Sequence, residues 1–151
     1  MLSNEEWGIV DRFVDLNSSL NRKFNNLIRA VVGDALTVEQ YTTLAHIQQA
    51  GSCTSSELAA EFGVKKSAVT SIINRLFEKE WVQRDTDPKD RRNIYLSLTD
   101  QGRTVFTETD LKIRRLVQPV IHEFQNEEIV DFLNQLERLD LLIGSINKAN
   151  Y

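Results

Sequence analysis

The sequence predicts a mainly α-helical protein with a small β-hairpin, arranged as a winged helix-turn-helix between long helices. Three observations carry this prediction. Apolar residues recur at three- and four-residue steps over most of the chain. Two short segments with this helical period meet at Gly63, which fits a tight turn. The period then changes to strict alternation between Asn93 and Leu98, which is typical of a strand.

Long helices are predicted at both ends of the chain. The first spans residues 4–32 and ends at Gly33, because glycine is common just past a helix. Two more are expected over about residues 99–124, with Thr99 as the cap, and 126–148, with Asn126 as the cap. The apolar stripe of the last helix is too wide for one small neighbouring domain to cover, so we expect a partner surface there.

Shorter helices are marked by their caps. Thr37 and Gln40 have the spacing of a capping box, and that helix closes at Gly51. Thr54 and Glu57 repeat the spacing before the helix that ends at Gly63. The third short helix covers about residues 65–79. One face of it is predicted to carry the apolar residues Val69, Ile72, Ile73, Leu76 and Phe77.

A hairpin follows directly. One strand is predicted over residues 81–84 and the other over 93–98, with a polar tip that contains Pro88. In the second strand Ile94, Leu96 and Leu98 share one side. A hairpin after a helix-turn-helix makes a winged helix.

Composition excludes several classes of protein. The chain has 151 residues, 41% of them hydrophobic and 26% charged, which is typical of a globular domain. One cysteine and two histidines leave no disulfide framework and no cysteine-based zinc finger. There is no apolar run of membrane-spanning length, and the N-terminus is acidic and polar. We expect a soluble cytoplasmic protein that makes no membrane contact.

Enzyme motifs are absent from the sequence. It contains no glycine-rich phosphate loop, no pair of histidines with zinc-protease spacing and no nucleophile elbow. We therefore predict that the chain is not an enzyme and carries no cofactor and no metal.

Charge is unevenly distributed. The net charge is -4, yet residues 64–103 hold nine basic and six acidic residues, a local charge of +3 that leaves -7 for the rest. A basic segment in an acidic protein fits a face that binds a polyanion such as DNA. A charged, solvated loop would give the same numbers.

The helix after Gly63 is the predicted DNA-recognition helix. Its polar face carries the side-chain types that read base edges or phosphates in a major groove. We assign base contacts to Lys66, Ser67, Thr70 and Ser71, and phosphate contacts to Asn74 and Arg75. The alternative is an ordinary solvated face. The predicted set is Lys65, Lys66, Ser67, Thr70, Ser71, Asn74 and Arg75.

The hairpin supplies the second predicted DNA contact. An arginine at its tip fits the negative potential of a narrow minor groove, and we assign this role to Arg92. Asp90 is expected to brace the guanidinium, and Arg91 to meet phosphate. A surface turn with weak ion pairs is the alternative. The predicted wing residues are Arg84, Lys89, Asp90, Arg91 and Arg92.

Two stretches resemble the MarR family of bacterial transcription regulators. One is SELA at residues 56–59 followed by FGVKKSAVT at 62–70, then Arg75-Leu76. The other is Arg84, DPKDRR at 87–92 and LSLT at 96–99, then Gly102. The second is more specific, because it combines wing tip, strand and the cap of the next helix at fixed spacing. With the flanking helices the resemblance covers nearly the whole chain.

The resemblance implies an intertwined homodimer built from the first and last helices. Residues 1–36 and 100–151 then form the helical dimerisation region, and residues 37–99 the winged helix-turn-helix DNA-binding domain. It also implies a palindromic DNA operator as partner, usually repression, and release by a small, often aromatic or phenolic, ligand. The dimer contacts that we predict are Val10, Phe13, Leu20, Leu133, Leu136 and Ile143.

The chain departs from the family pattern at three positions. Lys65 stands where a capping serine or threonine is common, which loses about 1 kcal/mol of capping but adds a cation. Ser71 stands where arginine is frequent, so base preference differs. Glu80 replaces a usual glycine at a helix end, with a backbone cost.

Two rival functions remain open. A dimeric winged-helix module that binds protein is consistent with the acidic total charge. A metal or redox sensor would use Cys53 or His46, with Glu39 and His122 as further candidate ligands. Most histidines on helices are ordinary residues, and a free cysteine is usually a small buried hydrophobe.

Overall fold

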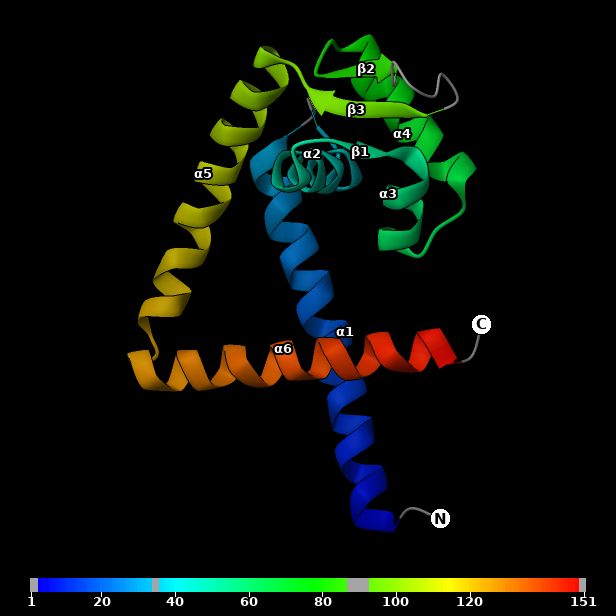
Figure 1. The fold of residues 1–151 in the computed structure, drawn as a ribbon. Helices are drawn as coiled ribbons and strands as arrows, with labels where there is room; N and C mark the ends of the chain where they lie inside the picture. Colours follow the sequence, from blue (N-terminus) through cyan, green and yellow to red (C-terminus); the bar gives the residue numbers. More distant parts are fainter. Residues whose placement is uncertain (1–2, 34–35, 87–92, 150–151) are drawn as a thin grey trace. The chain divides into compact units, whose positions relative to one another are not determined.

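The structure, a computed structural model, describes residues 3–33, 36–86 and 93–149, with side chains described as far as residue 145 (Figure 1). It divides into two compact units, residues 1–113 and 114–151, and one helix crosses the boundary. In chain order the elements are α1 (Asn4–Val32), α2 (Val38–Ala50), β1 (Cys53–Thr54), α3 (Ser55–Phe62), α4 (Lys66–Glu78), β2 (Val82–Thr86), β3 (Ile94–Leu98), α5 (Asp100–His122) and α6 (Asn126–Ala149).

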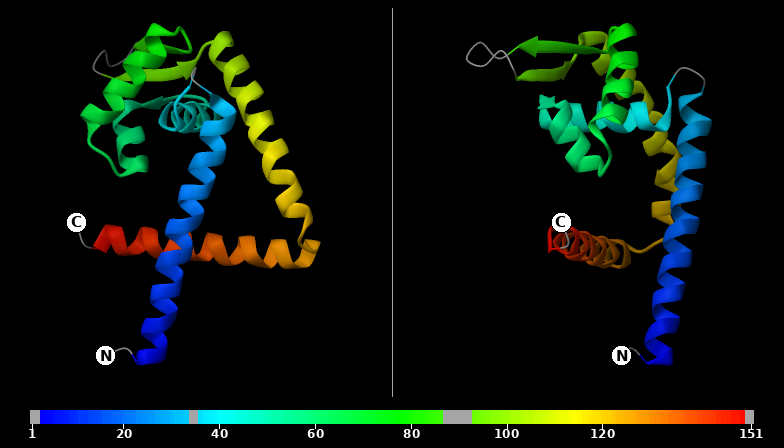
Figure 2. Two further views of the ribbon diagram at one scale, coloured as in Figure 1. Left: turned by 180° about the vertical axis from the view of Figure 1, so that it is seen from behind. Right: turned by 90° about the vertical axis from the view of Figure 1, so that its right-hand side faces the viewer.

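The predicted winged helix is confirmed, and it lies within the first unit. Helices α2, α3 and α4 are followed by the hairpin of β2 and β3, which Figure 2 shows as two long strands side by side. The sheet has the order β1-β3-β2, and both pairs are antiparallel. Val82 pairs with Leu98 at one end of the hairpin, and Thr86 pairs with Ile94 at the other.

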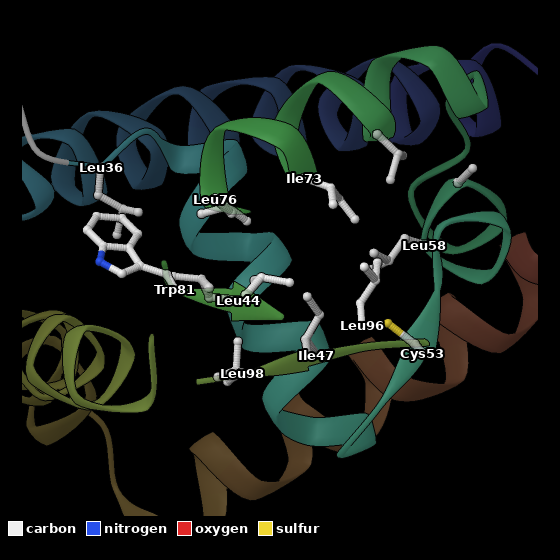
Figure 3. Close-up of a cluster of buried hydrophobic side chains, with 13 residues drawn as sticks. Leu36, Leu44, Ile47, Cys53, Leu58, Ile73, Leu76, Trp81, Leu96 and Leu98 are labelled. Atoms are coloured by element: carbon white, nitrogen blue, oxygen red, sulfur yellow. The ribbon is translucent and has the colours of Figure 1, made fainter. Parts of the chain in front are cut away.

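A single cluster of apolar side chains forms the core of this unit (Figure 3). Leu44 and Ile47 reach it from α2, Ile73 and Leu76 from α4, and Leu96 from β3. All five are at most 1% exposed. The core thus fixes α4 against both α2 and the wing.

The predicted helix starts are confirmed where a side chain makes the cap. Thr37 and Thr54 each accept the backbone N–H three residues on, at 3.2 Å, in complete capping boxes. The hydroxyl of Thr99 accepts the N–H of Gly102 at 2.9 Å and begins α5. Ser3 forms a further capping box with Glu6 at the start of α1.

One predicted cap is wrong. Asn126 is already helical in α6, and the residue before the helix is Gln125. The backbone N–H of Gln125 donates to the carboxylate of Glu128 at 2.9 Å. A glutamate three residues on therefore satisfies the start of α6, and the asparagine side chain is not the cap.

Two residues of the predicted apolar faces are exposed. Phe77 is 47% exposed, because the contact between α4 and the core is narrower than the predicted apolar face of the helix. Ile94 is also 47% exposed. It is the first residue of β3, and the first buried position of that strand is Leu96. Ile72 is half-buried beside the core.

The expected backbone cost at Glu80 is present. Its φ is 58°, in the left-handed region that disfavours residues with a Cβ. The backbone N–H of Glu80 donates to the carbonyl of Phe77 at 2.9 Å, and its carbonyl accepts the hydroxyl of Thr99 at 2.6 Å. These two bonds hold the turn from α4 into the wing.

We expect Gly102→Ala to destabilise the protein. A Cβ there would lie 1.9 Å from the carbonyl oxygen of Trp81, which also accepts the N–H of Thr99. Because backbone must move, the cost is about 1–3 kcal/mol or more in the free energy of unfolding by urea. Gly8→Ala is the control: its Cβ would meet nothing within 4 Å. Equal stability of the Gly102→Ala variant and the wild type would contradict this account.

Candidate nucleic-acid interface

Helix α4 presents one apolar and one polar face. Val69, Ile73 and Leu76 are at most 1% exposed and anchor the helix in the core. On the other side the structure exposes every residue of the predicted recognition set. The shared, exposed face is therefore confirmed, while its contact with DNA stays a prediction. The exposed set is Lys65, Lys66, Ser67, Thr70, Ser71, Asn74 and Arg75.

The start of α4 is suited to an anion. Lys65 is the N-cap residue and makes no side-chain cap, as its departure from the family pattern predicts. The first turn, which the structure describes in full, contains no acidic residue. A helix N-terminus carries a partial positive charge, and the exposed Lys65 and Lys66 add to it. Phosphate oxygens match this end of the helix.

Thr70 has only part of its hydrogen-bonding capacity available. Its hydroxyl donates to the backbone carbonyl of Lys66 at 2.9 Å. The side chain can therefore offer DNA its methyl group and an oxygen lone pair, but not a second donor. A methyl group matches the C5-methyl of thymine.

A contact between the wing and α4 was missed by the sequence-based reasoning. The guanidinium of Arg84, on β2, lies 4.8 Å from the ring centroid of Phe77. It also donates to Oδ1 of Asn74 at 2.5 Å. The exposed Phe77 and Asn74 stand three residues apart on α4 and so share a face. No sequence signal indicates this contact, because Phe77 belongs to the predicted apolar face of the helix and its exposure is seen only in the structure.

The far part of the predicted wing lies outside the described residues. These positions are Lys89, Asp90, Arg91 and Arg92, whose roles stay predictions. In the described part of the hairpin, the carboxylate of Asp85 accepts from Ser97 Oγ at 3.0 Å and from Gln83 Nε2 at 3.3 Å. The bond from Ser97 joins β3 to β2 on their exposed side, while the bond from Gln83 lies within β2.

Cys53 does not have the properties of a redox sensor. It is 3% exposed on β1, and its sulfur points toward Leu96 in Figure 3. Burial, with a smaller contribution from the charge of Glu57, raises the pKa of the thiol to about 11. At neutral pH the thiol is protonated and therefore a poor nucleophile.

The candidate metal ligands do not assemble. His46 is half-buried and packs edge-on against Phe62, with ring centroids 5.8 Å apart. Glu39 is exposed on α2. Within residues 3–33, 36–86 and 93–149, no three His, Cys, Asp or Glu side chains are placed to hold a metal ion.

The long helices expose large apolar side chains in the single chain. In α1, Val10, Phe13 and Leu20 are 38–47% exposed, and α1 has no buried residue among those the structure describes. In α6, described by itself, Leu133, Leu136 and Ile143 are 42–49% exposed. The predicted dimer contacts are thus available to a partner, as the wide apolar stripe required.

Comparison with known proteins places this architecture. The sequence pattern of the MarR family matches residues 36–94. The chain is 35% identical over 118 residues to the HTH-type transcriptional repressor MdtR of Bacillus subtilis, covering 76% of each protein. The chain belongs to the MarR family. As a MarR-family protein it is a transcription regulator that binds DNA, and it is not an enzyme.

Solved structures agree in fold. A mutant MarR from E. coli complexed with operator DNA matches with a TM-score of 0.75 at 23% identity, covering 88% of this chain and 96% of that one. BpsR of Bordetella bronchiseptica matches with a TM-score of 0.73 at 20% identity, covering 85% of this chain and 98% of that one.

None of the described helices is long and apolar enough to cross a membrane.

We expect the Cys53 thiol to resist alkylation in the folded protein. Its pKa is raised from 9.0 to about 11, so the thiolate fraction stays small until the pH approaches 11. The same shift contributes stability that is complete below pH 9 and is lost as the pH rises through 11. Iodoacetamide labelling followed by mass spectrometry, with urea-unfolded protein as the control, measures this. Rapid labelling of folded protein at pH 7 would reinstate the redox interpretation.

Proposed function

We propose that this MarR-family protein is a homodimeric repressor that binds a palindromic operator with two copies of helix α4 and its wing. The observation that carries the proposal is the exposed, cationic face of α4, held in place by the buried side chains of Val69, Ile73 and Leu76. A helix fits the major groove, and two such helices in a dimer meet successive grooves about 10 base pairs apart. The wing arginines, Arg91 and Arg92, take the flanking phosphate and minor groove.

The exposed apolar faces of α1 and α6 support a homodimer. Two copies of one chain supply the same stripes twice, which is what a two-fold interface needs. MdtR, the relative in Bacillus subtilis, is named a repressor, and this supports repression as the outcome of binding.

We also propose that a small aromatic or phenolic molecule releases the repressor. BpsR, of the same fold, is described as regulated in DNA binding by 6-hydroxynicotinic acid. In this chain Tyr41 links α2 to α5: its hydroxyl donates to Asp110 at 2.9 Å, and its ring stacks on Phe106. A ligand at this contact could shift α2, and with it α4. A panel of hydroxylated aromatic acids that leaves DNA occupancy unchanged would contradict this regulation.

We expect Lys65→Ala to weaken operator binding and to flatten its salt dependence. Each cation that meets phosphate releases counterions, so the slope of log Kd against log salt falls by about 0.9. The helix start loses no cap, because Lys65 makes none. Lys112→Ala removes an equally exposed cation from α5 and serves as control. Fluorescence anisotropy on a fragment recovered by genomic footprinting measures both. An unchanged slope for Lys65→Ala would contradict the placement of α4, and salt-independent binding would favour a protein partner.

We expect the double variant Leu136→Glu and Ile143→Glu to be monomeric. It places two charges seven residues apart on the apolar stripe of α6. The control is Asn134→Glu with Leu141→Glu, which has the same spacing on the opposite side of the helix, where Leu141 is 74% exposed. Light scattering should give 17.4 kDa for the first variant and twice that for the control. A first variant that remains dimeric would remove α6 from the interface.

A further inference from the structure

Arg84 determines how Asn74 can read DNA. A guanidinium has only donors, so the carboxamide of Asn74 must turn its oxygen toward Arg84. The 2.5 Å bond to Oδ1 is charge-assisted, and the position of the guanidinium over Phe77 gives Arg84 a second contact on the same helix face. Asn74 is therefore held in one of its two amide orientations.

Within residues 3–33, 36–86 and 93–149, the amino group of Asn74 donates to no protein acceptor and is available to an external partner. Asn74 is exposed, and its bond from Arg84 is the one hydrogen bond that the structure gives its side chain within the described residues. Free asparagine recognises adenine by using both ends of the amide, accepting from N6 and donating to N7. Here one of the two lone pairs of the oxygen is engaged by a positively charged donor, and that charge disfavours the approach of a second donor to the other lone pair.

We propose that Arg84 is a positioning residue that makes Asn74 a hydrogen-bond donor only, so that Asn74 reads acceptor atoms of DNA and does not select adenine. Such acceptors are phosphate oxygens and the N7 and O6 atoms of purines. This deepens the proposed function and rests on α4 facing DNA.

The first test compares how the wild type and Asn74→Ala bind chemically modified DNA. A methylphosphonate scan and 7-deazapurine substitutions locate the acceptor, and they distinguish phosphate from base. At the located position the loss of the acceptor should weaken wild-type binding roughly tenfold, the size of one good contact, and leave Asn74→Ala unaffected. An adenine at that position or next to it is then replaced by the unsubstituted purine base, which lacks the N6 amino group. This replacement should leave the affinity of the wild type unchanged.

A second test separates positioning from simple charge. Arg84→Met keeps the stem but frees the amide, so the base preference should shift toward adenine. Arg84→Lys retains a charged donor and should keep the wild-type preference. In the Asn74→Ala background, Arg84→Met should cause no further change in preference. Arg75→Met is the matched control, since it removes the same charge from an exposed neighbour of Asn74 and should weaken all sequences alike.

Two results would overturn the inference. One is a wild-type loss of binding when the N6 amino group is removed, because Asn74 would then be accepting. The other is an Arg84→Met variant with the base preference of the wild type. In each case operator binding by the wild type leaves the proposed function standing. Failure of the wild type itself to bind its footprinted DNA would instead remove the proposed function.

Discussion

The burial of Val69, Ile73 and Leu76 is the constraint on which the rest of the molecule depends. These side chains fix the rotation of α4 about its own axis. Once one face of the helix is fixed, the direction of the opposite face is fixed as well. Rotation by one residue in either direction would put Arg75 or Asn74 into a core that contains Leu44 and Leu96. The energetic cost of that burial is what keeps the polar face outward.

A second set of constraints joins α4 to the wing and to α5. The carbonyl of Trp81 accepts the N–H of Thr99, and the Thr99 hydroxyl donates to the carbonyl of Glu80. Gly102 lies against the Trp81 backbone so closely that no Cβ fits. The hairpin therefore leaves and returns to the body at a fixed point, and Arg84 on β2 can reach Asn74 and Phe77 on α4.

Signals between residues close in the sequence predicted much of the fold, whereas contacts between residues far apart in the sequence could not be predicted. Spacing of apolar residues predicted α1 and α4 within a residue, and the capping boxes at Thr37 and Thr54 were confirmed, because both signals act within one helical turn. The exposure of Phe77 could not be predicted, since the period of apolar residues does not tell how wide a helix contact is. The pairing of Arg84 with Asn74 could not be predicted, because it depends on where β2 passes α4. Asn126 failed as a cap because Gln125 and Glu128 satisfy that helix start.

The left-handed backbone of Glu80 has a consequence beyond the stability of one turn. Codons for glutamate and glycine differ by a single nucleotide, so a relaxed version of this junction is one base change away. Glycine at position 80 would remove about 1–2 kcal/mol of this strain, because it has no Cβ. A single base substitution therefore suffices to stabilise the point where α4 meets the wing.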